Sequence, residues 1–157
     1  MSEWPQLEWE ESKTAFDWDG SWRDLYVFDT SAEDWQRLVG FVKKSGHDYT
    51  FRRDGEIYPL PAHVNVLLRR DREAGFLLSI DVDGLWVNTN FFCTEQIELD
   101  IDPRQVQSEE RAQALFGFMR GIGQALGKAV RLTPENLSDY VLFEYDPLGD
   151  TLQRVRP

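Results

Sequence analysis

The sequence predicts an α+β fold: a largely antiparallel sheet of about seven or eight strands, built as a meander with Asp-Gly hairpins, with two helices packed on one face. Asp-Gly pairs interrupt three strand-like stretches, and this pair favours the tight turn of an antiparallel hairpin. Apolar residues recur at helical spacing over about 31–45 and 108–130. Most strand-like stretches lie together between these helices, an order typical of α+β proteins rather than of alternating βαβ units.

The N-terminal residues 1–12 are acidic and contain Trp4 and Trp9. We expect this segment to be an arm whose tryptophans dock on the folded domain, because a chain end is ordered only where it is tied down. Residues 13–29 follow with the first Asp-Gly pair, Asp19-Gly20, between aromatic and apolar runs. This arrangement predicts a hairpin whose second strand is buried.

The first helix is expected over residues 31–45. Ser31 is a favourable N-cap, and Asp34 stands three residues later, in the place of the capping-box acid. Lysines in the last turn suit the negative end of the helix dipole, and Gly46 then ends the helix.

The region after this helix should begin with a hairpin. Asp54-Gly55 separates two strand-like runs within residues 48–60, and prolines end the second run. Residues 63–70 are expected to form the next strand. Two basic clusters lie here, and a salt-bridged strand edge is their simplest interpretation; they are Arg52 with Arg53 and Arg69 with Arg70.

Residues 76–102 are expected to form three strands of the meander. The two-residue turn at Asp83-Gly84 fixes the register of the first two strands. Because side chains alternate across a strand, one side of this hairpin is apolar and the other polar. The predicted opposed pairs are Val82 with Leu85, Asp81 with Trp86, Ile80 with Val87, Ser79 with Asn88, and Leu78 with Thr89. The third strand alternates apolar residues with acids that should point outward to solvent, namely Glu98, Asp100 and Asp102.

The second helix is expected to run from Ser108, its cap, to about residue 130. It contains four glycines, Gly117, Gly121, Gly123 and Gly127, and each interior glycine costs roughly 0.5–1 kcal/mol relative to alanine. Close approach of the helix to the sheet or to the other helix is the simplest explanation. The last strand is expected at 140–145, so that 13–146 form a single domain and 147–157 form a C-terminal tail.

Length and charge limit the classes of function. A chain of 157 residues with 13% aromatic residues suits one ordered domain. Its net charge of −11 disfavours nucleic acid and anionic membranes and favours basic partners. A single cysteine, Cys93, the absence of a secretory pattern at the N-terminus and the absence of a long apolar run lead us to expect a cytoplasmic protein.

No catalytic constellation is recognisable in the sequence. The glycines before Lys128 lack the spacing of a phosphate-binding loop and the Ser or Thr that follows its lysine. A nucleophilic Cys93 paired with His63 has no local signature, and Asp81 with Asp83 forms only a fragment of a calcium loop. Outward acids such as Asp81 and Glu98 are common on strands, so they do not identify a glycosidase pair. We therefore expect no catalytic residue, no metal and no cofactor.

The best candidate site is the polar side of the 76–90 hairpin. Trp86 is a wide aromatic side chain, and Ser79, Asp81, Asn88 and Asn90 supply hydroxyl, carboxylate and amide groups around it. Such a combination can bind a polar ligand or anchor a protein partner. The alternative is that Trp86 packs beneath the N-terminal arm or a helix and has only a structural role.

We therefore expect a non-enzymatic protein-interaction module, of the inhibitor or immunity type, that binds a basic protein. Small acidic α+β immunity and inhibitor proteins have this size and charge, although the likeness is general and rests on no motif. The alternative function is a small polar ligand-binding domain that uses the Trp86 face of the sheet. The sequence leaves the oligomeric state open, and a homodimer is one of the states it allows.

Overall fold

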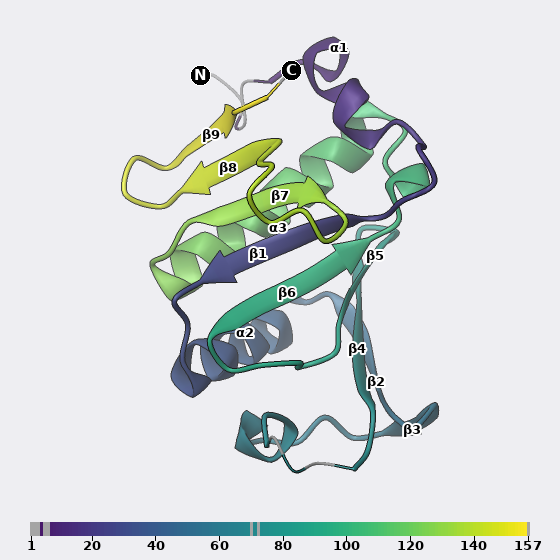
Figure 1. The fold of residues 1–157 in the computed structure, drawn as a ribbon, viewed down its shortest axis with the longest axis vertical. Coiled ribbons are helices and arrows are strands. Elements are labelled where there is room, and N and C mark those ends of the chain that lie inside the picture. The colour runs from purple at the N-terminus through teal and green to yellow at the C-terminus, as the bar shows by residue number, and fades with distance from the viewer. Residues whose placement is uncertain (1–3, 5–6, 70, 72, 157) are drawn as a thin grey trace.

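The structure, a computed structural model, describes residues 4, 7–69, 71 and 73–156. It is an α+β fold with one nine-stranded antiparallel sheet and, in the described part of the chain, three α-helices (Figure 1). The predicted fold class is confirmed, and the strand number is slightly higher than expected. Neither α2, α3 nor any other helix of the described residues has the length and apolar character needed to cross a membrane.

The strands are β1 (Arg23–Phe28), β2 (Asp48–Arg53), β3 (Glu56–Tyr58), β4 (Phe76–Val82), β5 (Leu85–Thr89), β6 (Gln96–Ile101), β7 (Val130–Pro134), β8 (Phe143–Asp146) and β9 (Thr151–Arg154). The helices are α1 (Trp9–Ser12), α2 (Ala32–Ser45) and α3 (Glu109–Leu126). Short 3₁₀ helices occupy Lys13–Phe16, Val64–Leu67 and Pro103–Gln105.

The strand order is β3-β2-β4-β5-β6-β1-β7-β8-β9, and neighbouring strands are antiparallel. Strand β1 comes first in the chain but lies between β6 and β7. The register of β5 and β6 contains one opposed pair, Asn88 with Asp100. At this junction the part of the sheet formed by β2, β4 and β5 turns away from the part formed by β6, β1 and β7 (Figure 1).

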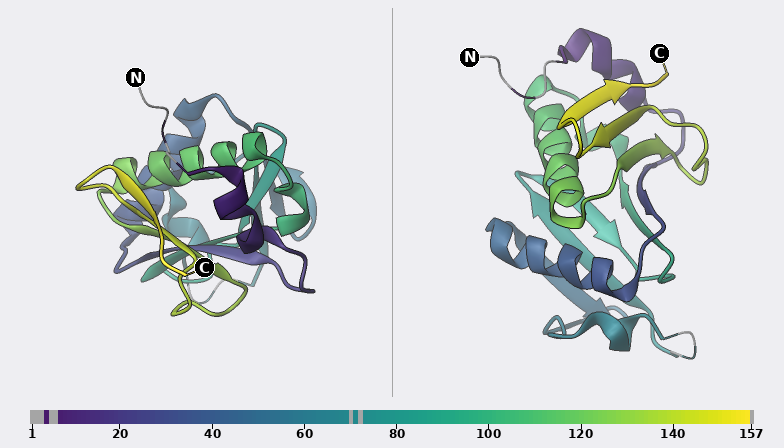
Figure 2. Two further views of the ribbon diagram at one scale, coloured as in Figure 1. Left: turned by 90° about the horizontal axis from the view of Figure 1, so that it is seen from above. Right: turned by 90° about the vertical axis from the view of Figure 1, so that its left-hand side faces the viewer.

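Helices α2 and α3 cover one face of the sheet and contact each other (Figure 2). The core lies between these helices and the sheet, and its fully buried side chains include Trp35 of α2, Phe116 of α3, Leu25 of β1 and Ile80 of β4. Within the described residues, the opposite face of the sheet carries no α-helix, and we call it the open face. This arrangement agrees with the prediction of two helices on one side of the sheet.

The hairpin of β4 and β5 has the predicted register at all five opposed pairs. Asp83 and Gly84 have φ of 52° and 91°, the positive values that a type I′ turn requires at both central residues. The hairpin at Asp54-Gly55 is also confirmed, as β2 and β3. Local turn chemistry therefore fixed both hairpins.

The predicted cap of the first long helix is present. The Ser31 side chain accepts a hydrogen bond from the Asp34 backbone N–H, and the Asp34 carboxylate accepts one from the Ser31 N–H. Gly46, with φ of 84°, ends α2 in the left-handed conformation. The helix therefore begins and ends where its capping residues stand.

Two glycines of α3 lie at close contacts, as the sequence suggested. A Cβ atom on Gly121 would lie 2.3 Å from the ring of Phe41 in α2, and one on Gly123 would lie 2.4 Å from the ring of Tyr145 in β8. A Cβ on Gly117 would meet no atom within 4 Å. Close approach to a neighbour therefore explains Gly121 and Gly123 but not Gly117.

The hairpin expected within residues 13–29 is wrong. Residues 13–16 form a 3₁₀ helix, and β1 pairs with β6 and β7 instead of with the preceding segment. The guanidinium of Arg23 is buried and donates hydrogen bonds to the carbonyl oxygens of Ala15, Asp17 and Ser21 at 2.7, 2.7 and 3.0 Å. The backbone before β1 therefore wraps around this side chain and does not form a strand.

The strand expected over residues 63–70 is also absent from the described residues of that range; Arg70 lies outside them. Val64–Leu67 is a 3₁₀ helix, which places the buried Val64 and Leu67 three residues apart on one side. Gln36 of α2 holds the start of this helix, because its side chain accepts from the Val64 N–H and donates to the Ala62 carbonyl oxygen. Helix α2 thus sets the local conformation.

The C-terminal region contains more strands than expected. Helix α3 ends at Leu126 because Gly127 has φ of 67°, and the residues from Val130 belong to β7. The last predicted strand, 140–145, is β8 at Phe143–Asp146, and the segment expected as a tail contains β9. Trp4 of the N-terminal segment lies beside this end, where its indole N–H donates to the Asp150 carbonyl oxygen at 3.0 Å.

Candidate functional site

The predicted site residues lie on or near the open face of the sheet. Ser79 on β4 lies opposite Asn88 on β5, and Asp81 lies opposite Trp86 one step along the same hairpin. Asn90 follows the end of β5 and donates a hydrogen bond to the Phe76 carbonyl oxygen at 3.2 Å. The structure thus brings the first four residues together in two adjacent pairs and places Asn90 beside a different part of β4.

Ser79 and Asn88 begin a row of polar side chains that crosses five strands. The Ser79 hydroxyl donates to Asn88 Oδ1 at 2.7 Å, and Asn88 Nδ2 contacts Asp100 Oδ1 on β6 at 3.4 Å. Asp100 lies opposite Asp24 on β1, and Asp24 lies opposite Thr133 on β7. We call these five residues the polar row. The row crosses the junction at which the two parts of the sheet meet.

A second layer of contacts surrounds the middle of the polar row. The Tyr26 hydroxyl donates to Asp24 Oδ2 at 3.1 Å and lies 3.5 Å from Glu98 Oε1. The backbone N–H of Asn136 donates to Asp24 Oδ2 at 2.8 Å. Asn136 belongs to the loop between β7 and β8, which lies across β1 on the open face (Figure 1). Asp24 is consequently only 2% exposed.

Three carboxylates of this region form what we call the acidic cluster: Asp24, Glu98 and Asp100. Burial raises the pKa of each, and it raises the pKa of Asp100 to about 6 even though the hydrogen bond from Asn88 opposes the shift. Repulsion from the charge of Asp24 raises the pKa of Glu98 and of Asp100 further. Among the described residues, no basic side chain forms an ion pair with any of the three.

Asp81 has a structural task at the hairpin turn. Its Oδ1 accepts a hydrogen bond from the Gly84 backbone N–H at 2.7 Å, which ties the side chain to the turn. Its neighbour Trp86 is 43% exposed, so Trp86 is not covered by the N-terminal segment or a helix. Of this pair, the tryptophan is the group that a binding partner could contact.

A chain of contacts links Trp86 to a second exposed tryptophan. The Trp86 backbone N–H donates to Gln105 Oε1 at 3.0 Å. The adjacent Arg104 stacks on Trp18 with its guanidinium carbon 4.0 Å from the ring centroid, and it also pairs with Asp102 at 2.8 Å. Trp18 is 48% exposed. Trp86 lies two residues from Asn88 on β5, so one of these two exposed aromatic side chains adjoins the polar row.

The geometry gives little support to a metal site, a nucleophilic Cys93 or a phosphate-binding loop. Within the described ranges, no group of three or more His, Cys, Asp or Glu side chains is arranged to hold a metal ion. Cys93 is half-buried, and its thiol contacts the Gln96 carbonyl oxygen at 3.7 Å. The glycines before Lys128 belong to α3 and its C-terminal cap.

Sequence reasoning missed the centre of the site. It identified Ser79 and Asn88 but treated Glu98 and Asp100 as solvent-facing acids, and it did not single out Asp24 at all. A local signal for Asp24 exists, because this carboxylate stands inside a strand whose other residues are mostly apolar or aromatic. A charged residue in a buried strand is rare unless it is paired or functional.

Comparison with known proteins gives no relative from which a function could be transferred: no protein-family model matches the chain, and no curated protein matches it.

Proposed function

We propose that the chain is a non-enzymatic interaction module of the inhibitor or immunity type, which binds a basic protein through the open face of its sheet. The observation that supports this function best is the acidic cluster, in which the half-buried carboxylates of Glu98 and Asp100 and the buried carboxylate of Asp24 have no basic partner among the described residues. A lysine or arginine of a partner would supply the missing positive charge.

The environment of the cluster favours such a contact. Part of the cost of desolvating Asp24 and Asp100 is already met in the free protein, because neighbouring strands and the Asn136 loop cover them. An incoming cation would remove repulsion among the carboxylates and gain charge-assisted hydrogen bonds. The net charge of −11 would also speed the encounter with a basic partner.

The exposed tryptophans suit the role of apolar anchors. Tryptophan is enriched among the residues that dominate binding energy, and such residues work best beside polar groups that exclude water. Trp86 stands two residues from Asn88 of the polar row on β5, and Trp18 is linked to Trp86 through Gln105 and Arg104. A partner could thus combine a basic side chain on the cluster with an apolar contact on either ring.

A small polar ligand on the Trp86 face has less support. Ser79 and Asn88 already hydrogen-bond each other, and Asn88 also contacts Asp100. These groups would have to give up internal hydrogen bonds in order to bind a ligand. A protein cation can instead approach the carboxylate oxygens without breaking that pair.

We expect binding to depend on both salt and the open face. The immobilised full chain should retain a basic protein at about 0.05 M salt and release it by about 0.5 M, because added salt shortens the range of charge interactions. The double variant Glu98→Gln with Asp100→Asn should weaken this binding about tenfold or more. The measurement is the dissociation constant of the recovered partner, determined for each variant.

A matched control removes the same charge from the opposite side of the molecule. Glu33→Gln with Glu110→Gln changes exposed acids in the first turns of α2 and α3. This variant should bind within about twofold of the wild type, since general electrostatic attraction is altered equally in both double variants. Equal weakening by both would contradict the assignment of the open face.

Replacing Trp86 with alanine should also weaken partner binding about tenfold, as expected for an exposed aromatic anchor of an interface. Leu148→Ala is the control, because Leu148 is 96% exposed and lies between β8 and β9, away from the polar row. The test is a titration of the partner against each variant. If Trp86→Ala binds as tightly as Leu148→Ala, the tryptophan is not part of the interface.

A further inference from the structure

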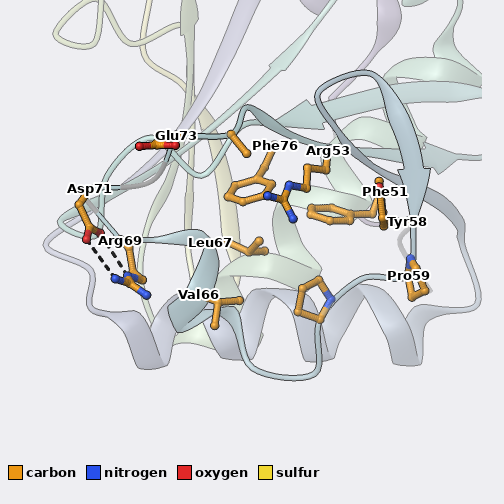
Figure 3. A pocket seen from close by; sticks show the side chains of 12 residues that line it. Phe51, Arg53, Tyr58, Pro59, Val66, Leu67, Arg69, Asp71, Glu73 and Phe76 are labelled. Atoms are coloured by element: carbon orange, nitrogen blue, oxygen red, sulfur yellow. Dashed lines mark hydrogen bonds and ion pairs between the residues drawn. The ribbon is translucent and has the colours of Figure 1, made fainter.

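A pocket of about 480 Å³ lies on the other side of the sheet, between the β2–β3 hairpin and the segment that leads to β4 (Figure 3). Its volume is within the range of small-molecule sites, roughly 300–1,000 Å³. Its walls are mostly apolar and include Phe51, Tyr58, Leu67, Val66 and Phe76. Neither the acidic cluster nor Trp86 lines it.

The floor of the pocket is aromatic and is continuous with the hydrophobic core. Phe51 is 4% exposed, and its ring stacks on that of Phe76 with centroids 5.8 Å apart. Leu67 of the 3₁₀ helix is 1% exposed and belongs to the same hydrophobic core. An apolar ligand would therefore find a preformed surface at the end of the core.

Arg53 gives this apolar pocket a positive charge. It stands two residues after the buried Phe51 on β2, so the alternation of the strand directs both side chains to the helix-covered side of the sheet. Figure 3 shows the Arg53 side chain directed toward the rings of Phe51 and Phe76. Among the described residues, Arg53 has no ion-pair or hydrogen-bond partner for its guanidinium.

The other charged residues at the pocket either have a partner of their own or lie on its solvent-exposed rim. Arg69 is neutralised by Asp71, to which it donates two hydrogen bonds at 3.1 and 3.0 Å. Glu73 lies on the rim, exposed to solvent (Figure 3). Glu56 lies opposite Arg53 on β3, but the hydrogen bond found for its carboxylate comes from the Tyr58 hydroxyl. Among the described residues that line the pocket, Arg53 is thus the cation without an ion-pair partner.

We propose that this pocket binds a small amphipathic carboxylate, with its apolar body on Phe51, Phe76 and Leu67 and its carboxylate on the guanidinium of Arg53. A planar guanidinium pairs with a carboxylate through two parallel hydrogen bonds, which fixes the orientation of the ligand. The site is independent of the proposed protein interface, which uses the opposite face of the sheet.

The probe is 1-naphthoate, added to the full chain and followed by NMR shifts of the backbone amides. We expect saturable binding with a dissociation constant between about 10 μM and 1 mM, as for a small ligand with one apolar body and one charge. The shifts should centre on Phe51, Leu67 and Phe76. The cationic analogue 1-naphthylmethylamine should bind at least about tenfold more weakly. Equal binding of the two compounds, or the absence of saturable binding, overturns the proposal.

Two neighbouring arginines on β2 provide a matched pair of variants. Arg53→Gln should weaken naphthoate binding about tenfold or more, because it removes the unpaired cation that lines the pocket. Arg52→Gln removes the same charge from the adjacent residue, which points to the open face and lies opposite Ile57 and Leu77, and it should leave binding within about twofold. Equal loss in both variants, or loss only in Arg52→Gln, refutes the site. Thermal unfolding of both proteins confirms that each variant is folded.

Discussion

Replacing Asp100 with asparagine should raise the free energy of unfolding at about pH 8 by about 2 kcal/mol. Burial raises the pKa of Asp100 to about 6, so the folded state disfavours the charged carboxylate. One pKa unit corresponds to about 1.4 kcal/mol, and partial solvation reduces the full value. Asparagine has nearly the same shape, and its carbonyl oxygen can still accept the hydrogen bond from Asn88.

The pH dependence follows from the direction of this shift. Because the pKa of Asp100 is higher in the folded state than in the unfolded state, its protonated form favours folding, and this contribution is lost as the pH rises through about 6. The benefit of Asp100→Asn should therefore be small near pH 4, grow up to about pH 7 and then remain constant. Urea unfolding followed by circular dichroism across this range measures it.

Asp102→Asn is the control for this experiment. The pKa of Asp102 is lowered, chiefly by its hydrogen bond with Arg104, so its charged form favours folding. The same chemical change two residues along the chain should reduce stability at neutral pH. If both variants shift stability in the same direction, burial does not govern the charge state of Asp100. The proposed interface adds a second test, because Asp100→Asn should gain stability while losing affinity for a basic partner.

Replacing Gly123 with alanine should lower the free energy of unfolding by about 1–3 kcal/mol, the usual cost of overpacking a core. The new Cβ atom would lie 2.4 and 2.5 Å from two carbons of the Tyr145 ring and 3.2 Å from the Lys128 carbonyl oxygen. The ring cannot easily move away, because Tyr145 is fully buried and its hydroxyl donates to Asp150 at 2.8 Å. Chemical denaturation measures the change.

Gly117→Ala is the control, because it makes the same substitution in the same helix at a position that does not contact the Tyr145 ring. A Cβ atom on Gly117 would meet no other atom within 4 Å, so alanine should stabilise the protein by about 0.5–1 kcal/mol through its higher helix propensity. The two variants should therefore move the unfolding midpoint in opposite directions. A stabilised Gly123→Ala protein would mean that α3 and β8 are packed less closely than the structure shows.

The elements that sequence predicts well depend on contacts between near neighbours. The β4–β5 register follows from two turn residues, and the start of α2 follows from Ser31 and Asp34. The two elements that were predicted wrongly, the hairpin within 13–29 and the strand over 63–70, depend on non-local contacts between a side chain and the backbone of another segment. Arg23 orders the segment before β1 through carbonyl groups, and Gln36 of α2 orders the 3₁₀ helix at Val64. Neither contact is visible from periodicity or turn chemistry.

The difference between local and non-local contacts also explains which residues of the site could be predicted from the sequence. Ser79 and Asn88 belong to one hairpin, so their pairing could be predicted. Asp24 and Asp100 meet only because β1 lies beside β6, and no local pattern indicates that neighbour. Without it, Glu98 and Asp100 look like ordinary acids on a solvated strand, whereas strand β1 and the Asn136 loop bury the region.

The placement of β1 also determines the order in which the chain can fold. The hairpins β2–β3 and β4–β5 close over short loops, whereas β1 must wait for β6 and β7, which are made much later during synthesis. Contacts between distant segments form slowly, because a long loop must close before they contribute. We therefore expect the carboxylates of Asp24 and Asp100 to be brought together late in folding. The surface proposed for binding would then exist only in a chain whose sheet is complete, and a partially folded intermediate would not present it.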